Sequence, residues 1–243
     1  MPTLLWVKMP SDWLGKGILR EHFSSRREKD ISGEISALKI YICLCLYSDR
    51  KMIPYPPILQ VHLKVLRERE LIGSSLTYDQ LSEYCSLSRV LVSRGLKKLI
   101  SCGLIHKQGT TRKVVYEIVG LSISGWCKLP CRALLGPNGR VVSFTGLKNR
   151  YPSERDALKL FLYLLSIRQN SLSEVSVSRG KISQTTGLSV YDIDSSIGVL
   201  RAIELIEDVK SLGYKMNTSS LPQESDRLAQ YLVKGGKSLN LKK

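Results

Sequence analysis

Histidine is scarce in this sequence, and the motifs of common enzymes are missing. Its 243 residues include three histidines, His22, His62 and His106, which lie far apart along the chain. No GxxxxGK[ST], GxSxG or GxGxxG pattern occurs. Nickases that open a DNA strand need clustered metal-binding histidines near a nucleophilic tyrosine, and these three cannot supply that cluster. We therefore expect no catalytic residue, no cofactor and no metal.

The cysteines do not have the spacing of a metal site. Two lie in the apolar run IYICLCLY, where a thiol packs as a small hydrophobe, and a third lies near the end of an expected helix. Two others lie in WCKLPCRALL, a strand-like lead-in to a helix, without a second ligand pair at zinc-like spacing. We expect core packing for Cys43, Cys45 and Cys102 and no zinc site at Cys127 and Cys131, while Cys85 lies at an expected turn.

Long apolar runs are also lacking. Nothing approaches the roughly 20 apolar residues of a membrane-spanning helix, and the start, MPTLLWVKMPSDW, has too short an apolar stretch for a secretory signal. The 43% hydrophobic and 24% charged residues are typical of a folded globular protein. We expect a cytoplasmic protein without a membrane partner.

Acidic residues are few relative to basic ones. The chain has 37 Lys and Arg against 21 Asp and Glu, a formal net charge of +16. Such an excess favours an extended polyanion as partner, either nucleic acid or an anionic membrane surface. The net charge therefore indicates only the class of binding partner. Which member of that class the chain binds must be inferred from sequence motifs.

An internal repeat organises the chain. Residues 6–10, WVKMP, match residues 126–130, WCKLP, and residues 37–42 match residues 157–162, both 120 positions apart. Further on, residues 81–105 match residues 182–206 at an offset of 101, so the first copy holds 19 extra residues, within residues 49–75. We predict two homologous units divided near residues 120–125, namely 1–121 and 122–220, followed by a tail, 221–243.

Each unit is expected to contain a buried helix, two helices joined by a turn, and a hairpin. In the first unit these cover residues 35–47, 77–85, 88–102 and 104–119, with a capping box at Thr77 and Gln80 and a cap at Ser88. In the second they cover residues 157–167, 181–185, 189–202 and 206–216. We further predict a Pro-rich turn and a short basic amphipathic helix in the insert, and a short helix at 225–233 before a basic tail.

The stretch LTYDQLSEYCSLSRVLVSRGLKKLISCGLI resembles the helix-turn-helix core of bacterial winged-helix proteins, and ISQTTGLSVYDIDSSIGVLRAIELI is similar. Two such units, each preceded by WVKMP or WCKLP, resemble plasmid replication initiators and phage origin-binding replication proteins. Leu91 stands where these families often have Thr, and the second copy has acidic residues where they are usually basic or neutral. The resemblance implies a mainly α fold with small β wings (α+β), made of two tandem winged helix-turn-helix units.

The second helix of the first pair is the expected DNA reader. With Val92, Leu96 and Leu99 in the core, its opposite face is polar and basic. We assign Ser93 and Arg94 to bases and Lys97 and Lys98 to phosphates, and we place Arg112 and Lys113 on the wing. From residue 86 to residue 115 there are seven Lys or Arg and no acid. The expected DNA-contacting residues are Ser88, Arg89, Val90, Ser93, Arg94, Lys97, Lys98, Lys107, Arg112, Lys113, Arg179, Lys181 and Tyr191.

The corresponding helix and wing of the second copy are locally acidic. Residues 189–210 contain two basic residues against five acidic ones. Asp192 lies in the first turn, where a carboxylate caps free N–H groups, whereas Asp194 has no such local explanation. A carboxylate facing phosphates weakens binding. We therefore expect the second unit to contact protein or to read DNA more weakly.

The favoured function is sequence-specific binding of double-stranded DNA without catalysis. An origin-binding replication initiator of a plasmid or other mobile element is the first reading, because two unlike units suit one chain spanning a repeated site. A transcriptional regulator and a protein-docking or assembly factor are the alternatives. A second copy of the chain, or a replication-machinery protein bound through the second unit, is the further partner considered. The expected location is the cytoplasm, on the nucleoid or a plasmid.

Overall fold

A computed structural model describes residues 4–24, 28–54, 68–109, 113–121, 125–214 and 227–233. The chain is mixed α/β, with small antiparallel sheets at the edges of a helical centre. The first half comprises β1 (Trp6–Pro10), α1 (Asp12–Gly15), α2 (Ile18–His22), α3 (Glu28–Leu46), β2 (Asp49–Pro54), β3 (Glu68–Ser74), α5 (Tyr78–Cys85), α6 (Arg89–Ser101), β4 (Ile105–Gly109) and β5 (Val114–Ile118). The second half comprises β6 (Trp126–Pro130), α7 (Cys131–Leu134), the 3-10 helix η1 (Val142–Gly146), α8 (Pro152–Ile167), β7 (Glu174–Ser178), α9 (Arg179–Thr186), α10 (Val190–Ala202), β8 (Ile206–Tyr214) and β9 (Arg227–Val233).

The two halves repeat one order of elements. Each has a long buried helix, a strand, two helices joined by a short turn, and two further strands. In the first half β3 pairs with β5 and β5 with β4, and in the second β7 pairs with β9 and β9 with β8. The repeat predicted from the sequence is therefore present in the arrangement of elements.

The insert of the first half contributes a hairpin at the edge of the sheet. β2 and β3 pair antiparallel from Asp49↔Gly73 to Pro54↔Glu68, which extends the first sheet to the order β2-β3-β5-β4. The helix expected in the insert falls on residues 55–67, outside the described residues. The structure therefore places strands at both ends of the segment where a turn and helix were predicted.

The end of the chain differs from the prediction. Residues 206–214 form one continuous strand, β8, and its partner is β9, where a helix at 225–233 was expected. β9 also pairs with β7, so residues 227–233, which fall in the expected tail, belong to the same sheet as residues 174–178. The helix prediction was wrong because β9 fits between two strands, where Tyr231 and Val233 alternate into the core.

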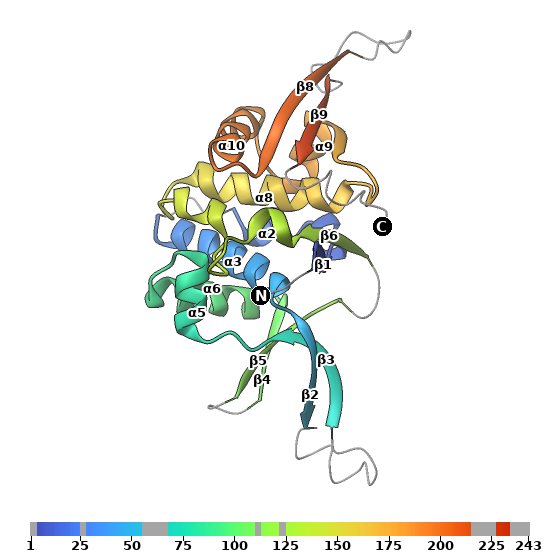
Figure 1. Cartoon of the computed structure of the whole chain (residues 1–243). Coiled ribbons are helices and arrows are strands. Elements are labelled where there is room, and N and C mark those ends of the chain that lie inside the picture. Colours follow the sequence, from blue (N-terminus) through green and yellow to red (C-terminus); the bar gives the residue numbers. More distant parts are fainter. Residues whose placement is uncertain are drawn as a thin grey trace.

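Helices α3 and α8 lie side by side at the centre of the molecule (Figure 1). α6 packs on the outer side of α3 and α10 on the outer side of α8, while the hairpins extend at opposite ends. Leu38 and Leu44 in α3 and Leu158 and Leu164 in α8 are completely buried in one cluster that spans both halves. The halves thus share one core, and separating them would expose the contact between α3 and α8.

The repeated lead-in segments pair with each other. β1 and β6 form a two-stranded antiparallel sheet in which Lys8 lies opposite Lys128. Trp6 stacks on Trp126 with ring centroids 5.8 Å apart, and each lysine lies over the other half's tryptophan, at 4.6 Å and 4.8 Å. This pairing is symmetric about its centre, so the two copies are related by an approximate twofold axis.

Two equivalent buried lysines follow the same symmetry. The Nζ of Lys39 donates to the carbonyl of Phe144 at 3.3 Å and to Oδ1 of Asn149 at 2.9 Å, both in the second half. The Nζ of Lys159, 120 positions later, donates to the carbonyl of Phe23 in the first half at 2.8 Å. Burial lowers the pKa of each lysine to about 8. Each half therefore donates one buried lysine hydrogen bond to a backbone carbonyl of the other half.

Candidate nucleic-acid interface

The α5–α6 pair is fixed at its ends by the residues that the sequence indicated. Thr77 and Gln80 form a reciprocal capping box at the start of α5, and the Oγ of Ser88 accepts from the N–H of Leu91 at the start of α6. Ser86 has a left-handed backbone in the turn between the helices, with φ 51°. The predicted caps are confirmed, and they set the direction in which α6 leaves the turn.

α6 packs closely against α3 through one glycine. A Cβ at Gly95 would lie 2.7 Å from Cδ1 of Ile40 and 2.9 Å from the N of Ala37, so a side chain would push the helices apart. Val92 and Leu99 are buried on the same face. The predicted core face of α6 is therefore confirmed, and its outer face is the one available to a partner.

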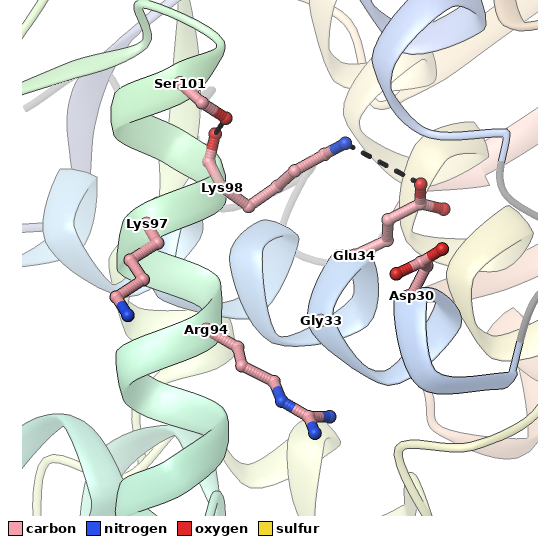
Figure 2. Close-up of a pocket in the computed structure, with 7 residues that line it drawn as sticks. All are labelled: Asp30, Gly33, Glu34, Arg94, Lys97, Lys98 and Ser101. Atoms are coloured by element: carbon pink, nitrogen blue, oxygen red, sulfur yellow. Dashed lines mark hydrogen bonds and ion pairs between the residues drawn. The ribbon is translucent and has the colours of Figure 1, made fainter.

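The outer face of α6 is polar, basic and partly apolar. Arg89, Val90 and Lys97 are exposed and Ser93 is half-buried. Arg94 is also half-buried, and it lies at the margin of this face that borders α3. Arg89 forms an exposed ion pair with Asp79 of α5, its Nη2 lying 3.2 Å from the Oδ1. Of the expected phosphate contacts on α6, Lys97 is the one whose ammonium points away from α3 (Figure 2).

A hollow of about 470 Å³ lies between the first turns of α3 and the middle and end of α6, beside their close contact at Gly95 (Figure 2). Its lining residues are Asp30, Gly33, Glu34, Arg94, Lys97, Lys98 and Ser101. The Nζ of Lys98 lies 3.8 Å from Oε1 of Glu34 and 5.6 Å from the ring centre of Phe23. Sequence reasoning assigned Lys98 to phosphates, but in the structure it turns inward because α3 presents a buried carboxylate.

Glu34 also contacts the second half. Its Oε2 lies 3.3 Å from Nη1 of Arg155 in α8, and Arg155 in turn donates to Asp156 at 2.8 Å. These three side chains are buried. Sequence reasoning missed this cluster, although Glu34 and Glu154 are equivalent in the repeat, and a carboxylate kept in an apolar helix was a signal for it.

The first hairpin carries the expected basic residues next to α6. Lys107 in β4 is exposed and lies opposite Tyr116 of β5, and Lys113 is exposed just before β5. Arg112 falls outside the described residues. Glu117 of β5 accepts from Gln108 at 2.8 Å. The hairpin predicted from the sequence is confirmed, and its exposed cations belong to the same half as Lys97.

The α9–α10 pair repeats the geometry with different chemistry. Gly187 ends α9 with φ 75°, and Ser189 and Asp192 form a capping box at the start of α10. The side chain of Arg179 in α9 makes two bonds to the Asp194 carboxylate, at 2.8 Å and 2.6 Å. The sequence offered no explanation for Asp194, and the structure supplies one, because a cation of the neighbouring helix pairs with it.

The exposed surface of the second helix pair is largely apolar at the first turn of α10. Tyr191 is 87% exposed and Val190 49% exposed, both in the first turn of α10. Lys181 is exposed in α9, where its backbone N–H is capped by Ser178. The structure thus places Tyr191 and Lys181 on the second pair, and Arg179 is engaged with Asp194.

The cysteines lie in the core. Cys43, Cys45, Cys85, Cys127 and Cys131 are buried and Cys102 is half-buried. Burial raises the pKa of Cys127 to about 12 and that of Cys131 to about 11, which keeps these thiols protonated near neutral pH. Among the described residues, no three His, Cys, Asp or Glu side chains gather in a way that would hold a metal ion. The expected core packing is confirmed for Cys43 and Cys45, and Cys102 packs against the core while half-buried.

No protein-family model, curated protein or solved structure matches the chain. Within the described ranges, no helix combines the length and apolar character needed to cross a membrane.

Proposed function

We propose that this chain binds double-stranded DNA sequence-specifically through two winged helix-turn-helix units. The order of elements supports the proposal, since α3–β3–α5–α6–β4–β5 and α8–β7–α9–α10–β8–β9 each read helix, strand, helix, helix and two-stranded wing. In such a unit the second helix of the pair enters the major groove and the wing contacts the flanking backbone. α6 and α10 are the proposed reading helices.

The observation that carries the proposal is the basic surface of the first unit. Exposed Lys97 on α6 and exposed Lys107 and Lys113 on the β4–β5 hairpin belong to a stretch, residues 86–115, without any acidic residue. The chain as a whole has a net charge of +16. Basic side chains on both reading helix and wing match the two strands of backbone that border a groove. The first unit is therefore the main DNA-binding unit.

The approximate twofold relation between the halves suggests the layout of the site. Two reading helices related by a twofold axis meet DNA in opposite directions, so their half-sites should lie in opposite orientations on the duplex. Because α6 and α10 carry different side chains, the two half-sites should differ in sequence. One chain would then occupy both halves of one site.

We propose an origin-binding replication initiator as the biological role. Two unlike reading helices in one chain allow a single copy to recognise an asymmetric site that is repeated along an origin. Iterated copies of the bound sequence beside the gene would support this role. A single bound site overlapping a promoter would instead favour a transcriptional regulator.

The experiment that tests DNA binding is a salt titration of duplex binding with the full chain. With about five to eight phosphate contacts, the logarithm of the affinity should fall against the logarithm of salt with a slope of roughly −4 to −7. Lys97→Ala should reduce the steepness of that slope by about 1. Lys8→Ala is the matched control, because Lys8 lies on the β1–β6 ribbon and away from α6. No duplex binding at low salt would contradict the proposal.

A further inference from the structure

The first turn of α10 exposes two large apolar side chains side by side in sequence. Tyr191 has the largest exposed fraction, 87%, among the exposed large hydrophobic side chains of the described residues, and Val190 is 49% exposed. Most other large side chains of the second half, such as Phe144 and Tyr231, are buried. Single exposed apolar side chains are common on protein surfaces, so it is the position of this neighbouring pair on α10 that makes it a candidate contact for a partner.

The repeat places this apolar surface at the position of a DNA reader. Tyr191 lies 101 residues after Val90, the offset that relates the two helix pairs, and Val90 is 64% exposed on α6. Each of these residues is the second of its helix, following the caps Ser189 and Ser88. Both proposed reading helices therefore present an exposed apolar side chain at the same point of their first turn.

Few charges around Tyr191 are available to contact DNA, so apolar contact is the main way in which this part of α10 can recognise a base. No Lys or Arg occurs from Ser189 to Leu200, so this part of α10 has no cation to bind a phosphate or a guanine edge. Both nearby carboxylates have internal partners: an Asp192 oxygen accepts from Ser189 Oγ at 2.7 Å, and Asp194 is paired with Arg179. The repulsion expected from two free carboxylates is thereby reduced.

We propose that α10 reads thymine through the 5-methyl group, with Val190 and Tyr191 as the contacting side chains. The thymine methyl is the apolar group that a base pair presents in the major groove, and apolar side chains contact it. Val90 makes the equivalent contact on α6, beside cations. This inference rests on the proposed DNA binding, and it gives the second unit a reading function that does not depend on positive charge.

The test removes the methyl group from the DNA rather than the whole base. The preferred duplex is first selected from random sequences with the full chain, and each thymine in turn is then replaced by deoxyuridine. At one or more thymines of one half-site the affinity should fall roughly fourfold, the value expected for one buried methyl group. Tyr191→Ala combined with Val190→Ala should remove this sensitivity in that half-site only.

Matched variants separate loss of the thymine contact from effects of substitution elsewhere on the surface. Tyr191→Phe keeps the ring and should keep the sensitivity to deoxyuridine. Val142→Ala is the control for Val190, because Val142 is 51% exposed in η1 and lies outside both helix pairs. Since none of these changes alters a charge, the salt slope should remain that of the unmodified chain.

Three results would overturn the inference, and they differ in what they leave standing. If the chain binds its selected duplex but deoxyuridine has no effect, or an effect that the Val190 and Tyr191 changes do not remove, DNA binding stands and the thymine contact is wrong. If those changes alter self-association in sedimentation but not DNA affinity, the surface docks a second copy of the chain. If no duplex binds, the proposed function and this inference both fail.

Discussion

The guanidinium of Arg155 lies 3.3 Å from the carboxylate of Glu34 and so joins α8 of the second half to α3 of the first. The same carboxylate lies 3.8 Å from the ammonium of Lys98 on α6. One buried acid therefore connects the proposed main reading helix to both central helices. The position of α6 against the two central helices depends on this contact as well as on apolar packing.

Loss of the Glu34 charge should destabilise the fold. Removing one partner of a buried ion pair leaves the other uncompensated, and here Asp156 still compensates part of the Arg155 charge. We expect Glu34→Gln to lower the free energy of unfolding by about 1 to 3 kcal/mol, measured by urea denaturation. Glu83→Gln is the control, since its pair with Arg140 is about half exposed, and it should cost less than about 1 kcal/mol. Equal losses of unfolding free energy in Glu34→Gln and Glu83→Gln would contradict a stabilising role for the buried Glu34 carboxylate.

Arg94 and Lys97 should affect DNA binding differently. Arg94→Ala should cost about 1 to 3 kcal/mol on the selected site and much less on random duplex, because a base contact is lost. Lys97→Ala should weaken both duplexes about equally, since a phosphate contact is independent of sequence. Fluorescence anisotropy on both duplexes measures the difference. If the two variants behave alike, the assignment of base and phosphate contacts is wrong.

Lys98→Ala tests the reassignment of that residue. Because its ammonium is turned toward Glu34, we expect a smaller loss of DNA affinity than for Lys97→Ala and a larger drop in melting temperature. The two lysines are neighbours in sequence, so each serves as control for the other. A DNA-binding defect in Lys98→Ala as large as that in Lys97→Ala would show that Lys98 faces phosphate in the complex.

The Arg179–Asp194 pair should modulate binding to any sequence. Asp194→Asn releases Arg179 and removes a negative charge near the proposed groove, so affinity for random duplex at low salt should rise roughly twofold to fivefold. Arg179→Ala leaves Asp194 without that guanidinium and should lower the affinity for random duplex at low salt. Asp49→Asn, which removes an exposed carboxylate paired with Lys51 in β2, is the control for net charge. A rise of equal size in Asp49→Asn would assign the effect to net charge alone.

The two buried lysines predict a pH dependence of stability. Folding lowers the pKa of Lys39 from 10.5 to about 8, so between these values the unfolded chain binds the extra proton. Stability from this group therefore rises with pH above about 8, and below it the folded state carries the full cost of burying the charge.

Comparison with Lys39→Met isolates the contribution of Lys39 to the pH dependence of stability. The raised pKa values of the buried cysteines act in the unmodified chain and in the variant alike, so their effect cancels. From pH 8 to pH 9.5, the free energy of unfolding of the unmodified chain should increase relative to Lys39→Met by about 1 to 2 kcal/mol. Lys159→Met should behave alike, since the pKa of Lys159 is also lowered to about 8. A constant difference across this range would contradict the lowered pKa.

Local signals in the sequence determined much of the fold. The caps at Thr77 and Ser88 and the apolar spacing in α6 depend on neighbours within a few residues, so they could be predicted without knowing the rest of the chain. The repeat also showed that two similar units would form. Its offsets even marked the position of the insert between α3 and α5.

Contacts between distant segments decided the rest. β9 became a strand because β7 and β8 offer it hydrogen-bonding partners on both sides, which the spacing of its own residues does not reveal. The pairing of β1 with β6, the inward turn of Lys98 and the neutralised Asp194 likewise depend on residues far away in sequence or on a neighbouring helix. The sequence alone determined which residues repeat and where the charges lie. Only the tertiary structure decided which of those charges have internal partners, because the energy of a charge depends on its burial and on the groups that folding places beside it.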